Sequence, residues 1–177
     1  GYVAAIRLSQ LGASVTLIER DRIGGTCLNQ GCISTKSLLA DAKLLRSLKR
    51  SPVFGRLLPD GFDPLESMMD RKRTVVQEMV KGVELLLQSH RANVIKARGD
   101  LAGTNRVVIQ DIEGVQKEID ADGIILAPGS RTKILPHLIP DGNRIITSGE
   151  ALEIRKVPPE IVIVGGGYIG VEFATLF

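Results

Sequence analysis

The chain has 177 residues, of which 44% are hydrophobic and 3% aromatic, and its net charge is +3. No apolar run is long enough to span a bilayer. With few aromatic residues and no nucleic-acid motif, the basic clusters Lys49-Arg50 and Arg71-Lys72-Arg73 predict solvated helix faces rather than a nucleic-acid partner.

Residues 1–12 predict a helix of small and aliphatic residues that ends at Gly12. A buried parallel strand, residues 13–18, follows it and leads into Glu19. In a dinucleotide-binding βαβ unit, an acidic residue about 20 positions beyond the glycine-rich turn accepts hydrogen bonds from the ribose hydroxyls. Glu19 fits that place if Gly1 is the third glycine of a GxGxxG motif. An ordinary surface glutamate is the alternative.

Both cysteines, Cys27 and Cys32, lie in the run GGTCLNQGCISTK, residues 24–36. Two thiols at this spacing indicate redox chemistry, metal binding or coincidence. Zinc normally takes four ligands, and both histidines lie far away in the sequence, which disfavours a metal. In a regular helix, Cα atoms five positions apart are about 8.6 Å apart, beyond the ~7 Å limit for a disulfide. A cycling pair therefore needs a distorted turn, and Gly31 permits one.

The middle of the chain predicts two amphipathic helices, residues 32–49 and 64–89, and then strands. The apolar side of the first helix consists of Ile33, Leu38, Leu39, Ala42, Leu45 and Leu48. The apolar side of the second consists of Leu65, Met68, Met69, Val76, Met79, Val80, Val83, Leu86 and Leu87. The predicted strands are residues 93–97, 106–110 and 115–121, followed by a buried strand at 123–127 and a sharp turn at 128–130.

The last segment predicts a second nucleotide-binding loop. An apolar strand, residues 161–164, precedes the motif Gly165-Gly166-Gly167-Tyr168-Ile169-Gly170, and a helix start is expected at 171–173. Gly165 and Gly167 would let the backbone approach a pyrophosphate, and Gly170 would let the helix pack closely on the strand. Because strand, glycines and helix occur in the required order, dinucleotide binding is favoured over a plain tight turn.

The run GGTCLNQGCISTK resembles the redox-active disulfide segment of the class I flavin-dependent pyridine-nucleotide disulfide oxidoreductases. It is most similar to the branch that oxidises dihydrolipoamide, and the branches that reduce glutathione disulfide or mercuric ion are related. The resemblance implies a redox disulfide in which Cys27 meets the substrate and Cys32 lies nearer the flavin. One departure is Ser34, which stands where the family usually has proline.

The resemblance covers essentially the whole chain and implies further roles. Gly99 would lie against the flavin adenine, with a turn glycine as the alternative. Lys36 and Glu172 would form an ion pair beside the reactive part of the flavin, with two unrelated surface charges as the alternative. Pro128 replaces the threonine of the family's Ala-Thr-Gly-Ser segment, so it lacks an amide proton and a hydroxyl. The residues assigned to catalysis are Cys27, Cys32, Lys36 and Glu172, and those assigned to cofactor binding are Gly1, Glu19, Gly25, Thr26, Lys36, Gly99, Pro128, Gly129, Ser130, Gly165, Gly166, Gly167, Tyr168, Ile169, Gly170 and Glu172.

The expected fold class is α/β. Residues 1–145 would form a Rossmann-like FAD-binding domain with a parallel sheet and an antiparallel β-meander, without its first strand and first glycines. Residues 146–177 would be a linker and the start of a Rossmann-like NAD(P)-binding domain. A C-terminal dimerisation domain is expected to lie outside this sequence, so we expect residues 1–177 alone to be inactive.

The expected activity passes electrons between a substrate dithiol, the cysteine pair, FAD and NAD or NADP, with dihydrolipoamide as the expected substrate. Glutathione, mercuric ion or a quinone are alternative substrates, and a non-catalytic nucleotide-binding protein is the alternative class. Expected partners are a small dithiol or a lipoyl domain, a second copy of the chain and a 2-oxo acid dehydrogenase complex, with no metal, nucleic acid or membrane. A cytoplasmic location is expected, with an organelle matrix as the alternative because the first residue is not methionine.

Overall fold

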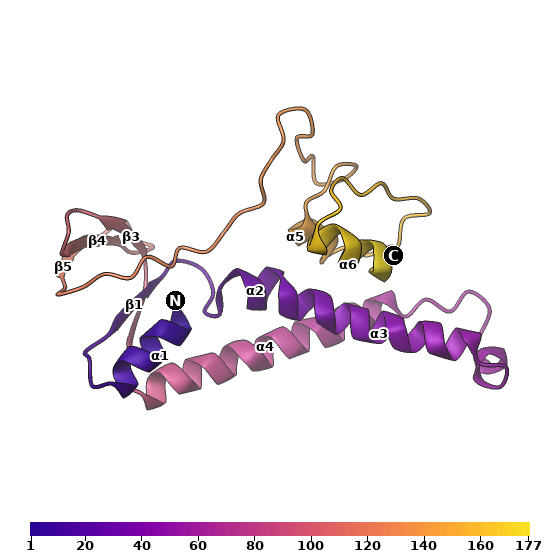
Figure 1. Cartoon of the computed structure of the whole chain (residues 1–177), viewed down its shortest axis with the longest axis horizontal. Coiled ribbons are helices and arrows are strands. Elements are labelled where there is room, and N and C mark those ends of the chain that lie inside the picture. Colours follow the sequence, from indigo (N-terminus) through magenta and orange to yellow (C-terminus); the bar gives the residue numbers. More distant parts are fainter. The chain divides into compact units, whose positions relative to one another are not determined.

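Most helices come in the first half of the chain and four consecutive strands follow them, and the computed structural model describes all residues from 1 to 177. Two units are formed, each from two separate stretches: residues 1–26 and 78–130 make the first, and residues 27–77 and 131–177 the second. The elements in chain order are α1 (Tyr2–Gln10), β1 (Thr16–Glu19), α2 (Gly25–Gln30), α3 (Cys32–Arg50), the 3-10 helix η1 (Phe54–Leu57), α4 (Leu65–Ser89), β2 (Asn93–Lys96), β3 (Arg98–Leu101), β4 (Arg106–Gln110), β5 (Gln116–Asp120), α5 (Ser148–Ala151) and α6 (Tyr168–Leu176) (Figure 1).

The first unit contains two small sheets. Strand β1 pairs in parallel with β2, with Thr16 opposite Asn93 and Glu19 opposite Lys96. Strands β3, β4 and β5 form an antiparallel meander. These sheets confirm the predicted α/β class with one parallel and one antiparallel component. Strand β3 was not predicted, because every residue in it is exposed and its pattern carries no alternation; pairing with β4 makes it a strand.

The predicted helices 1–12, 32–49 and 64–89 are confirmed as α1, α3 and α4. All six positions predicted for the apolar side of α3 are buried or half-buried. On α4, Met79 and Leu86 are exceptions, because both are exposed in the structure. Hydrophobic periodicity therefore located the long helices well, while the neighbours of each helix determined which apolar positions were covered.

The two strands predicted for residues 123–127 and 161–164 are wrong. Neither segment pairs with another strand, and most of their apolar side chains are exposed, Leu126 to 68% and Val162 to 88%. The backbone N–H and C=O groups of a strand need hydrogen-bond partners on a neighbouring strand. An apolar run without such a neighbour therefore does not form a strand. The helix after the second segment begins at Tyr168, three residues before the predicted start.

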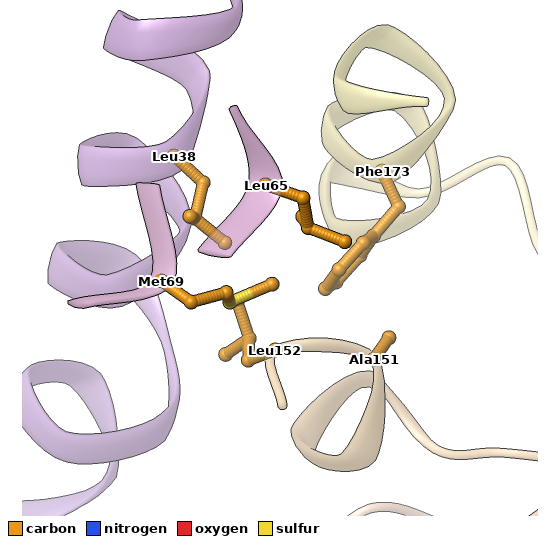
Figure 2. Close-up of a cluster of buried hydrophobic side chains, with 6 residues drawn as sticks. All are labelled: Leu38, Leu65, Met69, Ala151, Leu152 and Phe173. Carbon is orange, nitrogen blue, oxygen red and sulfur yellow. The ribbon is translucent and has the colours of Figure 1, made fainter. Parts of the chain in front are cut away.

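Side chains from four helical segments form the hydrophobic core of the second unit. Helix α3 packs against α6, and the cluster drawn in Figure 2 consists of Leu38, Leu65, Met69, Ala151, Leu152 and Phe173. Helix α5 was missed because it lies in the predicted linker. Its signal is Thr147-x-x-Glu150, and both hydrogen bonds of that capping box are present.

Lys72 was expected on a solvated face, and this expectation is wrong: its side chain is buried. Lys72 follows Met69 by three residues and precedes Val76 by four, so it shares the buried face of α4. Its Nζ donates to the backbone carbonyl of Leu152 and forms an ion pair with Glu153. The buried ammonium group is thus supplied with acceptors, which lowers the cost of removing it from water.

The pH dependence of stability should report on this ion pair. Burial raises the pKa of the Glu153 carboxyl, but the hydrogen bond and charge of Lys72, with the charge of Arg73, outweigh burial and hold the pKa below its ordinary value of 4.5. A carboxylate with a lowered pKa stabilises the fold above its unfolded-state pKa, and this contribution is lost as the pH falls through the folded-state pKa. Urea unfolding should therefore show Glu153→Gln less stable than wild type at pH 7, with the difference shrinking below pH 4.5.

Glu160→Gln is the matched control, because Glu160 is exposed and forms no ion pair in the structure. Its stability should follow that of wild type at every pH. A difference between wild type and Glu153→Gln that stayed constant from pH 7 to pH 3 would contradict the prediction.

Candidate functional site

The two cysteines flank a break between two helices. Helix α2 ends at Gln30, Gly31 has φ −147° and ψ −122°, which is neither helical nor extended, and Cys32 opens α3. Cys27 and Cys32 form a disulfide, and their Cα atoms are 4.8 Å apart. The distorted turn predicted at Gly31 is present, and it brings the Cα atoms well inside the ~7 Å limit for a disulfide.

Hydroxyl groups in the first turn of α3 hold this break together. The hydroxyl of Thr35 donates to the carbonyl of Gly31 at 2.9 Å, and the backbone N–H of Thr35 donates to the same carbonyl. The Oγ of Ser34 lies 3.1 Å from the carbonyl oxygen of Asn29. Both hydroxyl-bearing residues are buried, whereas Cys27 and Cys32 are exposed. The disulfide therefore lies on an exposed, hydrogen-bonded turn, and burial does not distinguish Cys27 from Cys32.

Lys36 and Glu172 form the ion pair that the family resemblance implies. Lys36 Nζ lies 2.7 Å from Glu172 Oε1. Lys36 is one turn beyond Cys32 on α3, and Glu172 is on α6, which packs against α3. The pair joins the helix that begins with a redox cysteine to the helix that follows the glycine-rich loop.

In the loop from Gly165 to Gly170, the two ends are in close backbone contact, and the glycines between them have free space around them. Gly165 has φ +115°, a conformation that favours glycine. A Cβ built at Gly170 would lie 2.0 Å from the carbonyl oxygen of Gly165, so the helix and loop backbones touch here. At Gly166 and Gly167 a Cβ would meet nothing within 4 Å. The open backbone leads directly into the N-terminus of α6, where unpaired N–H groups favour a phosphate.

In the first unit, three predicted cofactor residues gather on strand β1. A Cβ at Gly1 would lie 3.7 Å from Leu17 Cδ1, and one at Gly99 would lie 3.4 Å from Ile18 Cγ2. Glu19 is the last residue of β1, and its Oε1 accepts a hydrogen bond from the backbone N–H of Asp21 at 2.9 Å. The carboxyl end of a parallel strand is where dinucleotides bind in open α/β sheets.

The turn at residues 128–130 approaches the start of the redox segment. Gly129 has φ +79°, and the backbone N–H of Ser130 donates to Thr26 Oγ1 at 3.4 Å. A Cβ at Gly129 would lie 3.1 Å from the same Thr26 oxygen. Pro128 offers no N–H to this arrangement. Ala127, just before the turn, lies beside Gly1, since a Cβ built there would be 3.8 Å from the Ala127 Cβ.

The donor chemistry of the first unit fits FAD. A carboxylate at the end of a parallel strand suits the ribose hydroxyls of a dinucleotide. Gly25 begins α2 with φ +72°, next to Thr26.

The structure contains no group of three or more potential metal ligands. A cavity of about 460 Å³ in the second unit, lined from α3, α4 and α6, includes none of the predicted site residues.

An exposed disulfide between α2 and α3, a lysine–glutamate bridge between α3 and α6 and a glycine loop before α6 are the features of the class of nucleotide-linked disulfide oxidoreductases. Residues 1–177 match the family model described as pyridine nucleotide-disulphide oxidoreductase, and the chain belongs to this family.

The individual relatives are consistent with this family assignment. The chain is 39% identical to a dihydrolipoyl dehydrogenase of Zymomonas mobilis and 41% identical to one of Bacillus subtilis, over 100% of its own length in both cases and 38% and 39% of theirs. Among solved structures it is similar to LpdA of Mycobacterium tuberculosis (TM-score 0.77, 28% identity, 89% of this chain and 36% of that one). It is also similar to RclA of Escherichia coli, described as a HOCl-induced flavoprotein disulfide reductase in a Cu(II) complex (TM-score 0.76, 28% identity, 99% and 36%).

Family membership confirms the predicted fold class and the predicted cofactors, FAD and NAD(P). The chain spans less than two fifths of the length of the two curated relatives. No helix in the structure combines the length and apolar character needed to cross a membrane.

The contacts of the glycine loop predict unequal tolerance of alanine. Gly170→Ala would force a Cβ against the Gly165 carbonyl, so we expect a loss of about 1–3 kcal/mol in the free energy of unfolding. Gly166→Ala places its methyl group in open space and should change the stability by less than about 0.5 kcal/mol. Thermal or urea unfolding without added nucleotide measures both. Equal losses in the two variants would contradict the close approach at Gly170.

Proposed function

We propose that the protein is an FAD-dependent dithiol oxidoreductase that oxidises dihydrolipoamide, free or on a lipoyl domain, and delivers the electrons to NAD or NADP. The observation that carries this proposal is the exposed Cys27–Cys32 disulfide held across a helix break. The relatives named dihydrolipoyl dehydrogenase, at about 40% identity, support the choice of substrate.

The substrate step is a thiol–disulfide exchange. One substrate thiolate attacks a sulfur of the Cys27–Cys32 bond and forms a mixed disulfide, releasing the other cysteine as a thiolate. The second substrate thiol then displaces the bound cysteine. The substrate leaves as a disulfide, and two electrons and two protons remain on the cysteine pair and nearby bases.

We assign the exchange step to Cys27 and the flavin-side position to Cys32. Cys32 is the first residue of α3, where the helix N-terminus favours a thiolate, and Lys36 follows one turn later. Cys27 lies in the short helix α2, on the other side of the break. FAD, when bound, accepts the electron pair from the cysteine side and makes it available to the nicotinamide.

The cofactor assignments divide between the two ends of the chain. Within a domain of residues 1–145, FAD would be held by Gly1, Glu19, Gly25, Thr26, Gly99, Pro128, Gly129 and Ser130. Within residues 146–177, the linker and start of the second nucleotide-binding domain, NAD(P) would be held by Gly165, Gly166, Gly167, Tyr168, Ile169 and Gly170. Lys36 and Glu172 would serve both catalysis and cofactor binding. A homodimer and association with a 2-oxo acid dehydrogenase complex complete the proposal.

The substrate is tested in the full-length, flavin-loaded protein. Reduction of NAD or NADP by dihydrolipoamide should proceed, while NADPH oxidation by glutathione disulfide or mercuric ion should be slow or absent. Rapid turnover of either of the latter substrates, without turnover of dihydrolipoamide, would reassign the substrate.

Serine variants distinguish the roles of the two cysteines. In the reduced, flavin-loaded protein, Cys27→Ser should retain a long-wavelength absorption band from a thiolate next to the flavin, because Cys32 remains. Cys32→Ser should lose this band. The reverse pattern in absorption spectra would exchange the two assignments.

The ion pair should tune the reactivity of the reduced Cys32. Lys36→Met removes a cation one turn away, so we expect roughly three- to tenfold slower alkylation of Cys32 at pH 7, since the thiolate is the reactive species. Glu172→Gln removes the carboxylate that offsets this cation and should act in the opposite direction.

Peptide mass spectrometry after timed alkylation reads the two cysteines separately. Lys43→Met, at an exposed position on the same helix, is the matched control and should leave the rate unchanged. Slower alkylation in both Lys36→Met and Glu172→Gln would indicate a loss of packing rather than an effect of charge.

A further inference from the structure

A buried hydroxyl connects the two helices that carry the cysteines. Ser34 is the third residue of α3 and is 1% exposed. Its Oγ lies 3.1 Å from the carbonyl oxygen of Asn29 and 3.4 Å from that of Leu28, so its single proton is shared between two acceptors. Both carbonyls belong to the last turn of α2. The last four carbonyls of a helix have no partner within the helix, and Ser34 supplies a donor to two of them.

The two carbonyl groups that accept from Ser34 lie close to Cys27 in the sequence. Leu28 directly follows Cys27, and Ser34 stands two residues after Cys32. The hydroxyl of Thr35, which is also buried, bonds to Gly31 inside the break and does not reach α2. The Ser34 hydroxyl therefore fastens the segment of one cysteine to the helix of the other.

We propose that Ser34 is a positioning residue that sets the thiol–disulfide equilibrium of the Cys27–Cys32 pair. By holding α2 against the start of α3, its hydroxyl keeps the two reduced thiols close and favours the disulfide. The inference rests on the proposed function only in requiring that the pair cycles between disulfide and dithiol. The reduction potential of the pair thus depends on Ser34, although Ser34 forms no bond to either sulfur.

Two substitutions remove the hydroxyl in different ways. Ser34→Ala deletes only the oxygen. Ser34→Pro introduces the residue that the family usually has here, and it suits the site because the N–H of a residue in the first helical turn has no intrahelical acceptor. Ser37→Ala is the matched control: Ser37 is a buried serine one turn further along α3, and its hydroxyl accepts from Arg71 rather than bonding to α2.

The experiment equilibrates the intact, flavin-loaded protein in glutathione redox buffers. In the reaction, two glutathione thiols reduce the disulfide, giving two cysteine thiols and one glutathione disulfide. Acid quenching, alkylation and mass spectrometry give the fraction of dithiol. We expect Ser34→Ala and Ser34→Pro to shift the equilibrium constant at least threefold towards the dithiol, equivalent to a potential about 14 mV less negative at 29.6 mV per tenfold change. Ser37→Ala should match wild type.

The outcomes separate this inference from the proposed function. A wild-type pair that cannot be reduced and reoxidised would overturn both. A wild-type pair that cycles, with an unchanged equilibrium in the folded Ser34 variants, would overturn only the role of Ser34. An equal shift in Ser37→Ala would also overturn it, because general loosening of α3 would then explain the effect. If Ser34→Ala does not fold, as judged by circular dichroism, Ser34→Pro decides the result.

Discussion

The interruption of one helix at Gly31 is the constraint on which the chemistry of this protein depends. Were α2 and α3 continuous, Cys27 and Cys32 would lie on different sides of the helix, about 8.6 Å apart. The backbone at Gly31 instead brings their Cα atoms to 4.8 Å. The same break makes Cys32 the first residue of a 19-residue helix, where unpaired N–H groups favour the thiolate. The break at Gly31 therefore determines both the distance between the two cysteines and the position of Cys32 at a helix N-terminus.

Helix α3 then links the disulfide to the rest of the second unit. Lys36 reaches Glu172 on α6, and Leu38 lies in the hydrophobic core with Phe173 of the same helix. A change in the packing of α3 would reach the redox pair, the ion pair and the glycine loop together. This shared support explains why buried hydroxyls in the first turn of α3 matter: they fix the end of the helix that bears Cys32.

Two lysines show how surroundings determine the use of a charge. Lys72 is buried, and both of its acceptors, the Leu152 carbonyl and Glu153, belong to the segment packed against α4. Its charge is satisfied by the fold and serves stability. Lys36 is exposed and has one carboxylate partner, Glu172. This pair joins α3 to α6 at the surface, four residues beyond Cys32.

The sequence by itself determined the features that arise from nearby residues. The helices α1, α3 and α4 follow from hydrophobic periodicity, and the break at Gly31 and the glycine loop at 165–170 follow from local residue types. Only the tertiary structure decided that 123–127 and 161–164 are not strands, that Lys72 is buried and that Glu153 is its ion-pair partner. The physical reason is the same in each case: a strand, a buried charge and an ion pair each need a partner, and a partner distant in the sequence is found only by folding.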